Sequence, residues 1–220
     1  ITRRIPSLTL PKRISNVKPG VPRVIFRTYG NLTVSKPMYN YCHYEWKRLN
    51  PEYIIVWFSN KQCDRFMEKV FPHLFDTYQM LKPGAYKADL WRLCVLYHFG
   101  GIYVDAFATP HQPLDKMLQN CWSISGRDQF IAPLDPPFSG SGVHNGFMVA
   151  SKHHPFLKQC IDDIVLNVKN KYYGESSLAI TGPICLRKSI NKVLNHKCKF
   201  RLGKNIHGPL TFYLLMFQWG

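Results

Sequence analysis

The sequence predicts an α/β fold whose sheet is mostly parallel in its first half. Three observations support this. Strand-like and helix-like segments alternate through the first hundred or so residues, as in folds built from strand-helix-strand units. The apolar segment 53–58 is only six residues long, which is the length of a buried strand. Finally, the glycine pair Gly100-Gly101 joins an apolar helix to an apolar strand that ends in Asp105.

The first elements follow a clear order. A strand is predicted at 21–26, where Pro22 lies near the start and the missing N–H donor does no harm. A second strand, at 53–58, is apolar at every position and should be buried on both faces. A helix is predicted after each strand, at 38–49 before the second strand and at 61–70 after it. The alternation favours parallel pairing of these strands.

A buried helix and a short strand form the central unit. Asp89 and Arg92 are three residues apart in this helix, so they lie on one face and within reach of each other. Gly100-Gly101 ends the helix as C-cap glycines do, and 102–104 has the composition of a strand. Asp105 then falls at the carboxyl end of that strand, where open α/β sheets bind their ligands.

The remaining segments are assigned by composition and periodicity. Between 70 and the central helix the chain reads as a loop containing Pro72 and Pro83. A loop rich in Ser, Gly and Pro at 121–142 is a candidate flap on the substrate side. The other predicted elements are a short helix within 109–120, a strand at 143–150, helices at 155–169 and 181–194, a short strand at 199–202 and an apolar tail at 211–219.

The chain has 220 residues, of which 45% are hydrophobic and 14% aromatic, so one domain with a real core is expected. We assign 1–20 to an extended arm and 21–220 to this single domain. No apolar run is long enough for a transmembrane helix, and no cleavable signal pattern is found at the start. An anchor or targeting segment upstream of this fragment stays open.

The formal net charge of +16 predicts attraction to polyanions, such as nucleic acid, anionic lipid or a phosphorylated substrate. A highly charged, solvated surface is the alternative. A nucleic-acid partner is disfavoured because the sequence has no recognisable nucleic-acid-binding motif. The seven cysteines include no C-x-x-C spacing. They favour a reducing compartment, although one or two disulfides in a secretory lumen stay open.

Several motifs resemble a known family when they are taken in order. Val21-Pro22-Arg23-Val24-Ile25 with Tyr29 resembles the opening I-P-K-x-I-H-x-x-W of the DXD-type sugar transferases of glycosyltransferase family 32, which are related to the yeast mannosyltransferase Och1. The run from Ala88 to Asp105 resembles the family pattern A-x-x-D-x-x-R, L-Y, G-G-I-Y-x-D. Asn145 to Ala150 and Thr181-Gly182-Pro183 resemble two later blocks of the family.

The resemblance implies a GT-A fold, which is a Rossmann-like α/β domain with a mixed, mostly parallel sheet flanked by helices. It further implies a hexosyltransferase that takes a sugar from a UDP- or GDP-sugar, with retention of configuration, and uses Mn²⁺ or Mg²⁺. The acceptor would be a hydroxyl of a glycan, protein or lipid. Two locations stay open: the Golgi lumen for a cellular eukaryotic protein, or the host cytoplasm for a viral or bacterial one.

The resemblance also assigns roles to single residues. Tyr29 would stack on the nucleotide base, and Tyr103 would line the same donor pocket. Asp89 and Arg92 would bind hydroxyls of the donor sugar. Asp105 would be the first acid of the DXD motif and a metal ligand.

One position departs from the family pattern. The second acid of the motif is replaced by Phe107, which removes a metal ligand and a negative charge. Three consequences stay open: Asp105 binds the metal with help from elsewhere, Lys and Arg side chains neutralise the diphosphate instead, or catalysis is reduced. The resemblance suggests His207 as a helping metal ligand, and it includes Asn145 among the catalytic residues.

The leading hypothesis is therefore a glycosyltransferase. A GT-A domain that has lost catalysis and kept its fold as a binding or scaffold module is the alternative, and a basic nucleic-acid-binding protein is the less favoured one. No pair of carboxylates suited to hydrolytic acid-base catalysis stands out in the sequence, so a glycosidase is disfavoured.

Overall fold

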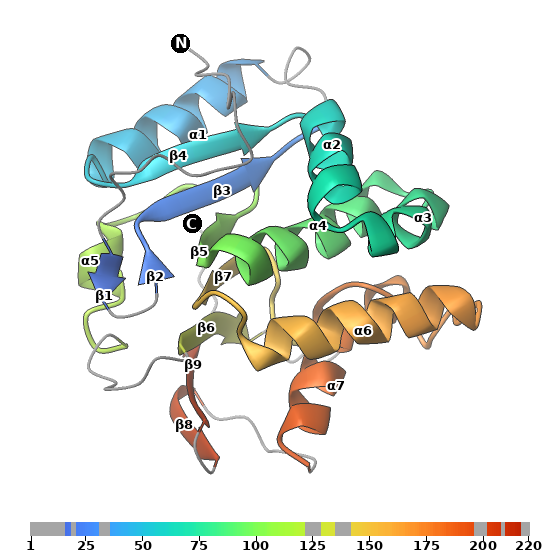
Figure 1. Ribbon diagram of the computed structural model, residues 1–220. Coiled ribbons are helices and arrows are strands. Elements are labelled where there is room, and N and C mark those ends of the chain that lie inside the picture. Colours follow the sequence, from blue (N-terminus) through green and yellow to red (C-terminus); the bar gives the residue numbers. More distant parts are fainter. Residues whose placement is uncertain are drawn as a thin grey trace.

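The structure is a computed structural model. It describes residues 16–18, 21–30, 36–121, 129–134, 142–195, 202–207 and 210–216. Within them the chain forms one seven-stranded sheet and a separate two-stranded pair (Figure 1). The pair consists of β1 (Asn16–Lys18) and β2 (Val21–Pro22), so the last part of the predicted N-terminal arm is a short strand.

The order of strands in the main sheet is β4-β3-β5-β7-β6-β9-β8. Their bounds are β3 Val24–Thr28, β4 Ile54–Phe58, β5 Gly101–Val104, β6 Gln129–Leu134, β7 Phe147–Ala150, β8 Gly203–His207 and β9 Leu210–Met216. The helices are α1 Lys36–Leu49, α2 Asn60–Val70, α3 Pro72–Met80, α4 Gly84–Phe99, α5 Leu114–Met117, α6 Pro155–Lys169 and α7 Pro183–Val193, with a 3₁₀ turn at Ser177–Ala179.

The predicted α/β fold with a mixed sheet flanked by helices is confirmed. Strand β3 pairs in parallel with both β4 and β5, as the alternation of the first half predicts. Strand β7 then runs antiparallel to both of its neighbours, β5 and β6. The second half adds a parallel pair, β6 with β9, and an antiparallel pair, β8 with β9. Parallel pairing therefore accounts for three of the six neighbouring pairs and is concentrated in the first half.

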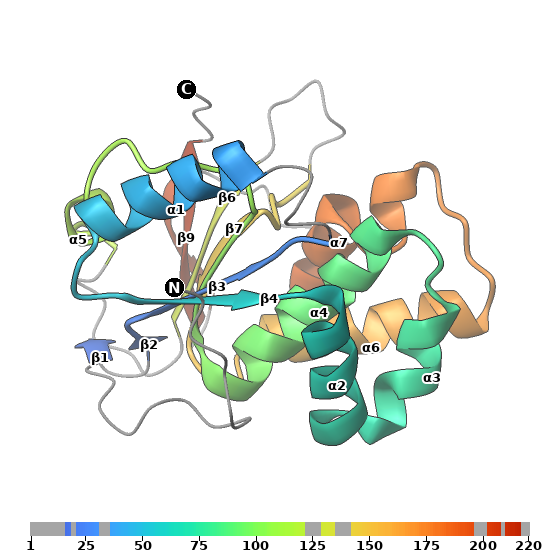
Figure 2. The same ribbon diagram turned by 90° about the horizontal axis from the view of Figure 1, so that it is seen from above.

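Two apolar layers hold the helices to the sheet. On one face, Val24, Phe26 and Tyr103 belong to the large core shared with α2, α3, α4, α6 and α7. On the other face, Ile25 and Ile102 pack with α1 and α5. Side chains alternate between the faces along each strand, so one strand supplies both layers. Figure 2 shows α1 and α5 on one side of the sheet and the other helices on the opposite side.

The glycine pair before β5 is required by close backbone contacts. Gly100 and Gly101 have φ values of 68° and 110°, which side-chain-bearing residues rarely adopt. A Cβ on Gly101 would also lie 2.9 Å from the carbonyl oxygen of Val24. The glycines thus allow the chain to leave α4 and enter the middle of the sheet at once.

Some predicted elements differ from the structure. The predicted loop after residue 70 contains α3, because Pro72 occupies the first turn of a helix, where its missing N–H is not needed. The predicted flap contains β6, a largely buried strand in which Pro133 is tolerated. Conversely, the strand predicted from 143 begins only at Phe147. The first predicted strand is divided into β2 and β3 at Arg23.

Other expectations fall partly outside the described residues. Most of the short strand predicted at 199–202 does so, and β8 begins just after it. The apolar tail forms β9 as far as it is described. The described helices include none that is both long and apolar enough to cross a membrane. The six described cysteines are all buried and free.

Candidate active site

The candidate site lies at the carboxyl end of β5. Because β7 runs antiparallel to β5, with Val104 opposite Phe147, the residues just before β7 lie beside the residues just after β5. Asp105 and the segment 144–146 therefore meet at this edge of the sheet, and a backbone hydrogen bond of 2.8 Å joins the Asp105 N–H to the Gly146 carbonyl. Helix α4 supplies Asp89 and Arg92 to the same place.

Asp89 and Arg92 form a buried ion pair, as their spacing predicts. Arg92 Nη2 lies 3.3 Å from Asp89 Oδ1. The side chain of Asp89 is only 12% exposed and that of Arg92 only 8%. The guanidinium of Arg92 also lies 3.1 Å from Asp105 Oδ1 and 4.5 Å from the centre of the Tyr103 ring. Arg92 thus contacts two carboxylates and one aromatic ring. Its Nη1 also donates a hydrogen bond of 2.9 Å to the carbonyl oxygen of Asn145.

Both oxygens of Asp89 accept hydrogen bonds. Asn145 Nδ2 donates to Oδ1 over 2.9 Å, and the Thr181 hydroxyl donates to Oδ2 over 2.7 Å. Burial raises the pKa of Asp89, whereas Arg92, Thr181 and Asn145 act to lower it. The ionised form fits this arrangement, since both oxygens accept and neither donates. Asn145, which was expected at the site, is therefore part of the network that fixes Asp89.

Thr181 is a site residue that sequence reasoning missed. It lies directly before α7, far from Asp89 in the sequence, and its side chain is buried. The motif Thr181-Gly182-Pro183 was noted only as a block of the resemblance, and the pattern does not say which of its residues faces Asp89. Its contact with Asp89 depends on how α7 packs on the same face of the sheet as α4.

Asp105 is the exposed acid of the site. Its carboxylate is 42% exposed, and Oδ1 accepts a 2.8 Å hydrogen bond from the Tyr103 hydroxyl. Burial, first of all, raises the pKa of Tyr103, and the nearby Asp105 adds to the rise while Arg92 opposes it. Tyr103 therefore remains a hydrogen-bond donor at neutral pH. Oδ1 is thus held by protein groups, whereas Oδ2 faces Gly146.

The loop that carries Asp105 is fixed by a buried arginine. Arg27 Nη2 donates to the carbonyl oxygens of Asp105, Ala106 and Ala108 over 2.8, 2.7 and 2.9 Å. Burial lowers the pKa of Arg27 to about 10, so it is charged at neutral pH. The guanidinium also lies 4.6 Å from the centre of the Trp57 ring. Arg27 is a positioning residue that the sequence analysis did not identify.

His144 faces the same side of the site as Asp105. A Cβ built on Gly146 would lie 2.5 Å from Asp105 Oδ2 and 2.5 Å from His144 Nε2, so only glycine fits there. These two distances also mean that the carboxylate oxygen and the imidazole nitrogen are at most about 5 Å apart. His144 was not among the predicted site residues, because a single histidine before Asn-Gly carries no spacing signal.

Tyr29, the residue expected to stack on the base, contacts Phe107. The ring of Tyr29, which follows β3, lies 4.6 Å from that of Phe107 in an edge-on arrangement. Phe107 is 41% exposed, so its ring is accessible to a ligand beside Tyr29. The residue that replaces the second acid of the DXD motif thus extends the aromatic surface of Tyr29.

The described residues fit a divalent cation only in part. Asp105 Oδ2 and His144 Nε2 are an oxygen and a nitrogen of the kind that Mn²⁺ binds, and Mg²⁺ sites often use one or two carboxylates beside substrate phosphates. No group of three or more His, Cys, Asp or Glu residues suited to a metal occurs among the residues that the structure describes. His207, the other expected ligand, lies in β8 opposite Leu210, and its side chain is outside the described part.

Comparisons with known proteins agree with this geometry. Residues 37–123 match the family model described as the glycosyltransferase sugar-binding region containing the DXD motif. This segment is similar to a DXD-type sugar-binding region. It carries Asp89, Arg92 and Asp105, so the three charged residues gathered at the edge of the sheet all lie within the matched region. The resemblance to DXD-type sugar transferases is confirmed.

Curated relatives of this sugar-binding region extend the match. The chain is 24% identical over 172 residues to "Mannosyl phosphorylinositol ceramide synthase CSH1" of Saccharomyces cerevisiae, covering 74% of this chain and 41% of that protein. It is 24% identical to "Inositol phosphoceramide mannosyltransferase 2" of Schizosaccharomyces pombe, covering 77% of this chain and 46% of that protein. The human "Alpha-1,4-N-acetylglucosaminyltransferase" is 22% identical, over 66% of this chain and 40% of its own length. The chain thus spans less than half of these relatives.

Solved structures show the same fold. The "PaToxG Glycosyltransferase" superposes with a TM-score of 0.62 at 16% identity and covers 80% of this chain and 70% of its own. The ligand-free glycosyltransferase domain of the YGT toxin superposes with a TM-score of 0.50 at 10% identity, over 81% of this chain and 78% of its own. The DXD-type sugar-binding region therefore lies in a GT-A fold.

Proposed function

We propose that the protein is a glycosyltransferase that moves a hexosyl group from a nucleotide-diphosphate sugar to a hydroxyl acceptor, with retention of configuration. The observation that carries the proposal is the chain of contacts from Asp89 through Arg92 to Asp105. It joins two carboxylates with one guanidinium at the carboxyl end of β5, at the edge where α/β folds bind ligands. The matched sugar-binding region supports the same activity.

The buried pair would bind the donor sugar. Asp89 and Arg92 are held from several sides, so they can offer hydrogen bonds to sugar hydroxyls without reorganising when the donor binds. Asn145 and Thr181 act through Asp89 and are positioning residues. Tyr29, with Phe107 beside it, would stack on the nucleotide base, since any of the bases can stack on an aromatic ring.

Asp105 and His144 would hold the divalent cation beside the diphosphate. A bound cation would neutralise the negative charge that builds up on the leaving diphosphate as the glycosidic bond breaks. Asp105 Oδ1 is already engaged by Arg92 and Tyr103, which leaves Oδ2 for the cation. The net charge of +16 adds a general attraction for a donor with two phosphates.

The test is hydrolysis of nucleotide sugars in the presence of Mn²⁺. A panel of UDP- and GDP-sugars should reveal at least one donor from which the protein releases the sugar to water or to an added acceptor. Asp105→Asn should abolish the release. Asp162→Asn is the matched control, because Asp162 lies on the exposed face of α6 and pairs only with Lys158 among the described residues. Equal activity of Asp105→Asn and the control would contradict the proposal.

The replacement at Phe107 favours a second candidate function, a GT-A module that binds a nucleotide without turning it over. Such a module would still bind a nucleoside diphosphate but would release no sugar from any donor. Calorimetry separates the two functions: metal-dependent nucleotide affinity with no donor hydrolysis supports the binding module. Metal-dependent affinity together with hydrolysis supports the enzyme.

A further inference from the structure

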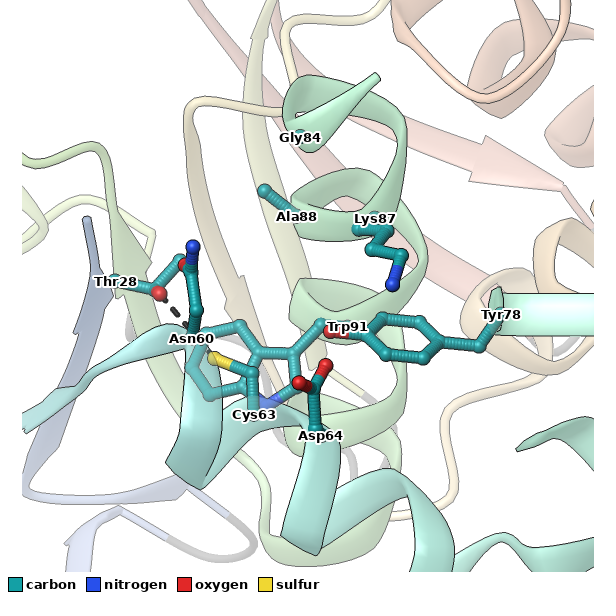
Figure 3. Close-up of a pocket in the computed structure, with 9 residues that line it drawn as sticks. All are labelled: Thr28, Asn60, Cys63, Asp64, Tyr78, Gly84, Lys87, Ala88 and Trp91. Carbon is teal, nitrogen blue, oxygen red and sulfur yellow. Dashed lines mark hydrogen bonds between the residues drawn. The ribbon is translucent and has the colours of Figure 1, made fainter. Parts of the chain in front are cut away.

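A cavity of about 110 Å³ lies next to the candidate active site. Trp91, which lines the cavity, contacts Tyr103 of the site, with ring centres 6.3 Å apart. Its walls come from the end of β3, the first turns of α2, the last turn of α3 and the first half of α4 (Figure 3). The lining residues are Thr28, Asn60, Cys63, Asp64, Tyr78, Gly84, Lys87, Ala88 and Trp91.

The cavity combines an apolar wall with three polar groups. Trp91 is fully buried and forms part of the wall. Figure 3 shows Asn60 on one side of the cavity and Lys87 on the other, with the Asp64 carboxylate directed toward the interior. Asn60 is exposed and Asp64 is half-buried, so a ligand can reach both side chains. The cavity therefore has the form of a small-molecule site, with a flat apolar surface and a few convergent polar groups.

Neighbouring residues orient these polar groups. Burial, first of all, raises the pKa of Tyr78, and the nearby Asp64 adds to the rise. The Tyr78 hydroxyl therefore remains protonated at neutral pH, and the oxygens of the Asp64 carboxylate have lone pairs for a ligand. Lys87 Nζ donates to Gln79 over 2.9 Å and lies 4.8 Å from the centre of the Tyr78 ring.

The hydrogen-bonding pattern of the cavity distinguishes the nucleobases. An ionised carboxylate only accepts hydrogen bonds. Among the bases, guanine alone presents two adjacent N–H donors, the ring N1–H and the 2-amino group, to such an acceptor. Uracil presents one N–H between two carbonyl oxygens, adenine presents a ring acceptor beside its amino group, and cytosine does the same. The carboxylate would repel the acceptors of these three bases.

We propose that this cavity is a guanine-selective base subsite, in which Asp64 accepts the N1–H and 2-amino donors of the base and the natural donor is a GDP-sugar. Lys87 and Asn60 supply N–H donors for the guanine O6 and N7 acceptors. The inference rests on the proposed glycosyltransferase function, since it names the nucleotide of that donor. It adds a base preference that Tyr29 cannot provide, because stacking is tolerant of base identity.

The test measures the affinity of the protein for GDP and for UDP by calorimetry in the presence of Mn²⁺. The wild-type chain should bind GDP at least about tenfold more tightly than UDP, as expected for a bidentate base contact. Asp64→Asn should lower GDP affinity about tenfold and should not lower UDP affinity, because the repulsion of the uracil carbonyl oxygens is removed. Asp76→Asn is the matched control, because Asp76 is exposed on α3 and does not line the cavity; it should change neither affinity.

A comparison of two nucleotides on the wild-type chain tests the same contact without the Asp64→Asn variant, so the result does not depend on whether that variant folds. Inosine diphosphate lacks the 2-amino group and should bind the wild-type chain about tenfold more weakly than GDP. A merely structural role of Asp64 beside Tyr78 would lower stability without changing the ratio of GDP to UDP affinity. Equal or tighter binding of UDP would overturn the guanine subsite and leave the glycosyltransferase proposal standing. Failure of both nucleotides to bind would overturn both.

Discussion

Replacing Asp89 with asparagine tests the buried network at its centre. The side chain keeps its shape, and the Thr181 hydroxyl can turn to accept from the new amide, so the main loss is the negative charge beside Arg92. Hydrogen bonds to charged groups contribute about 1.5–3 kcal/mol, and we expect Asp89→Asn to lower the free energy of unfolding by about that amount. Asp89→Ala also leaves the Asn145 amide unpaired, and we expect a loss of about 3–5 kcal/mol.

Urea unfolding followed by tryptophan fluorescence measures these losses. Asp162→Asn is again the control, because it removes an exposed ion pair and should change the free energy of unfolding by less than about 1 kcal/mol. Donor binding should fall at least tenfold in Asp89→Asn and remain unchanged in the control. If Asp89→Asn were as stable as the control, the buried ion pair and its two hydrogen bonds could not have the role described.

Three further predictions follow from other parts of the structure. Phe107→Asp restores the second acid of the motif, so it should raise Mn²⁺ affinity at least tenfold by electron paramagnetic resonance; unchanged affinity would mean that this loop does not face the metal. Gly146→Ala places a Cβ 2.5 Å from Asp105 Oδ2, so Mn²⁺ binding should be lost while circular dichroism stays near that of the wild type. Burial lowers the pKa of His154 to about 3, so the unfolded chain alone takes up its proton as the pH falls below about 6.5. Stability should therefore decrease by about 2 kcal/mol between pH 6 and pH 4.5 through this group, and His154→Asn should remove that part of the decrease in urea titrations at both pH values.

Sequence patterns predict the first half of the fold well because its signals are local. The buried strands, the glycine break and the spacing of Asp89 and Arg92 each arise within a short stretch of chain. The antiparallel entry of β7 beside β5 has no such local signal, since nothing in 143–150 states which strand it will join. The sequence also does not predict the buried strand β6. Ser, Gly and Pro on both sides of this strand give the whole region the composition of a loop.

The same limit applies to the site. Asp89, Arg92 and Asp105 come from one helix-strand unit, so their meeting could be predicted. Thr181 and Arg27 reach them from distant segments. Both contacts depend on how α7 packs and on how β3 lies beside β5, and these arrangements follow only from the assembled sheet.

The surroundings of Phe107, which replaces the second acid of the motif, are visible only in the structure. The sequence says only that an acid is missing. The structure pairs the Phe107 ring with Tyr29 and brings His144 Nε2 within about 5 Å of Asp105 Oδ2. The replacement therefore extends the aromatic surface of Tyr29, and in the proposed function the nearby imidazole of His144 supplies a second metal ligand.

A crystal structure of the protein with a GDP-sugar and Mn²⁺ tests the central claim most directly. We predict sugar hydroxyls within hydrogen-bonding distance of Asp89 and Arg92, the metal at Asp105 and His144, and the base beside Tyr29. A nucleotide bound elsewhere at full occupancy, with the network of Asp89, Arg92 and Asp105 untouched, would contradict the assignment of this edge of the sheet as the donor site.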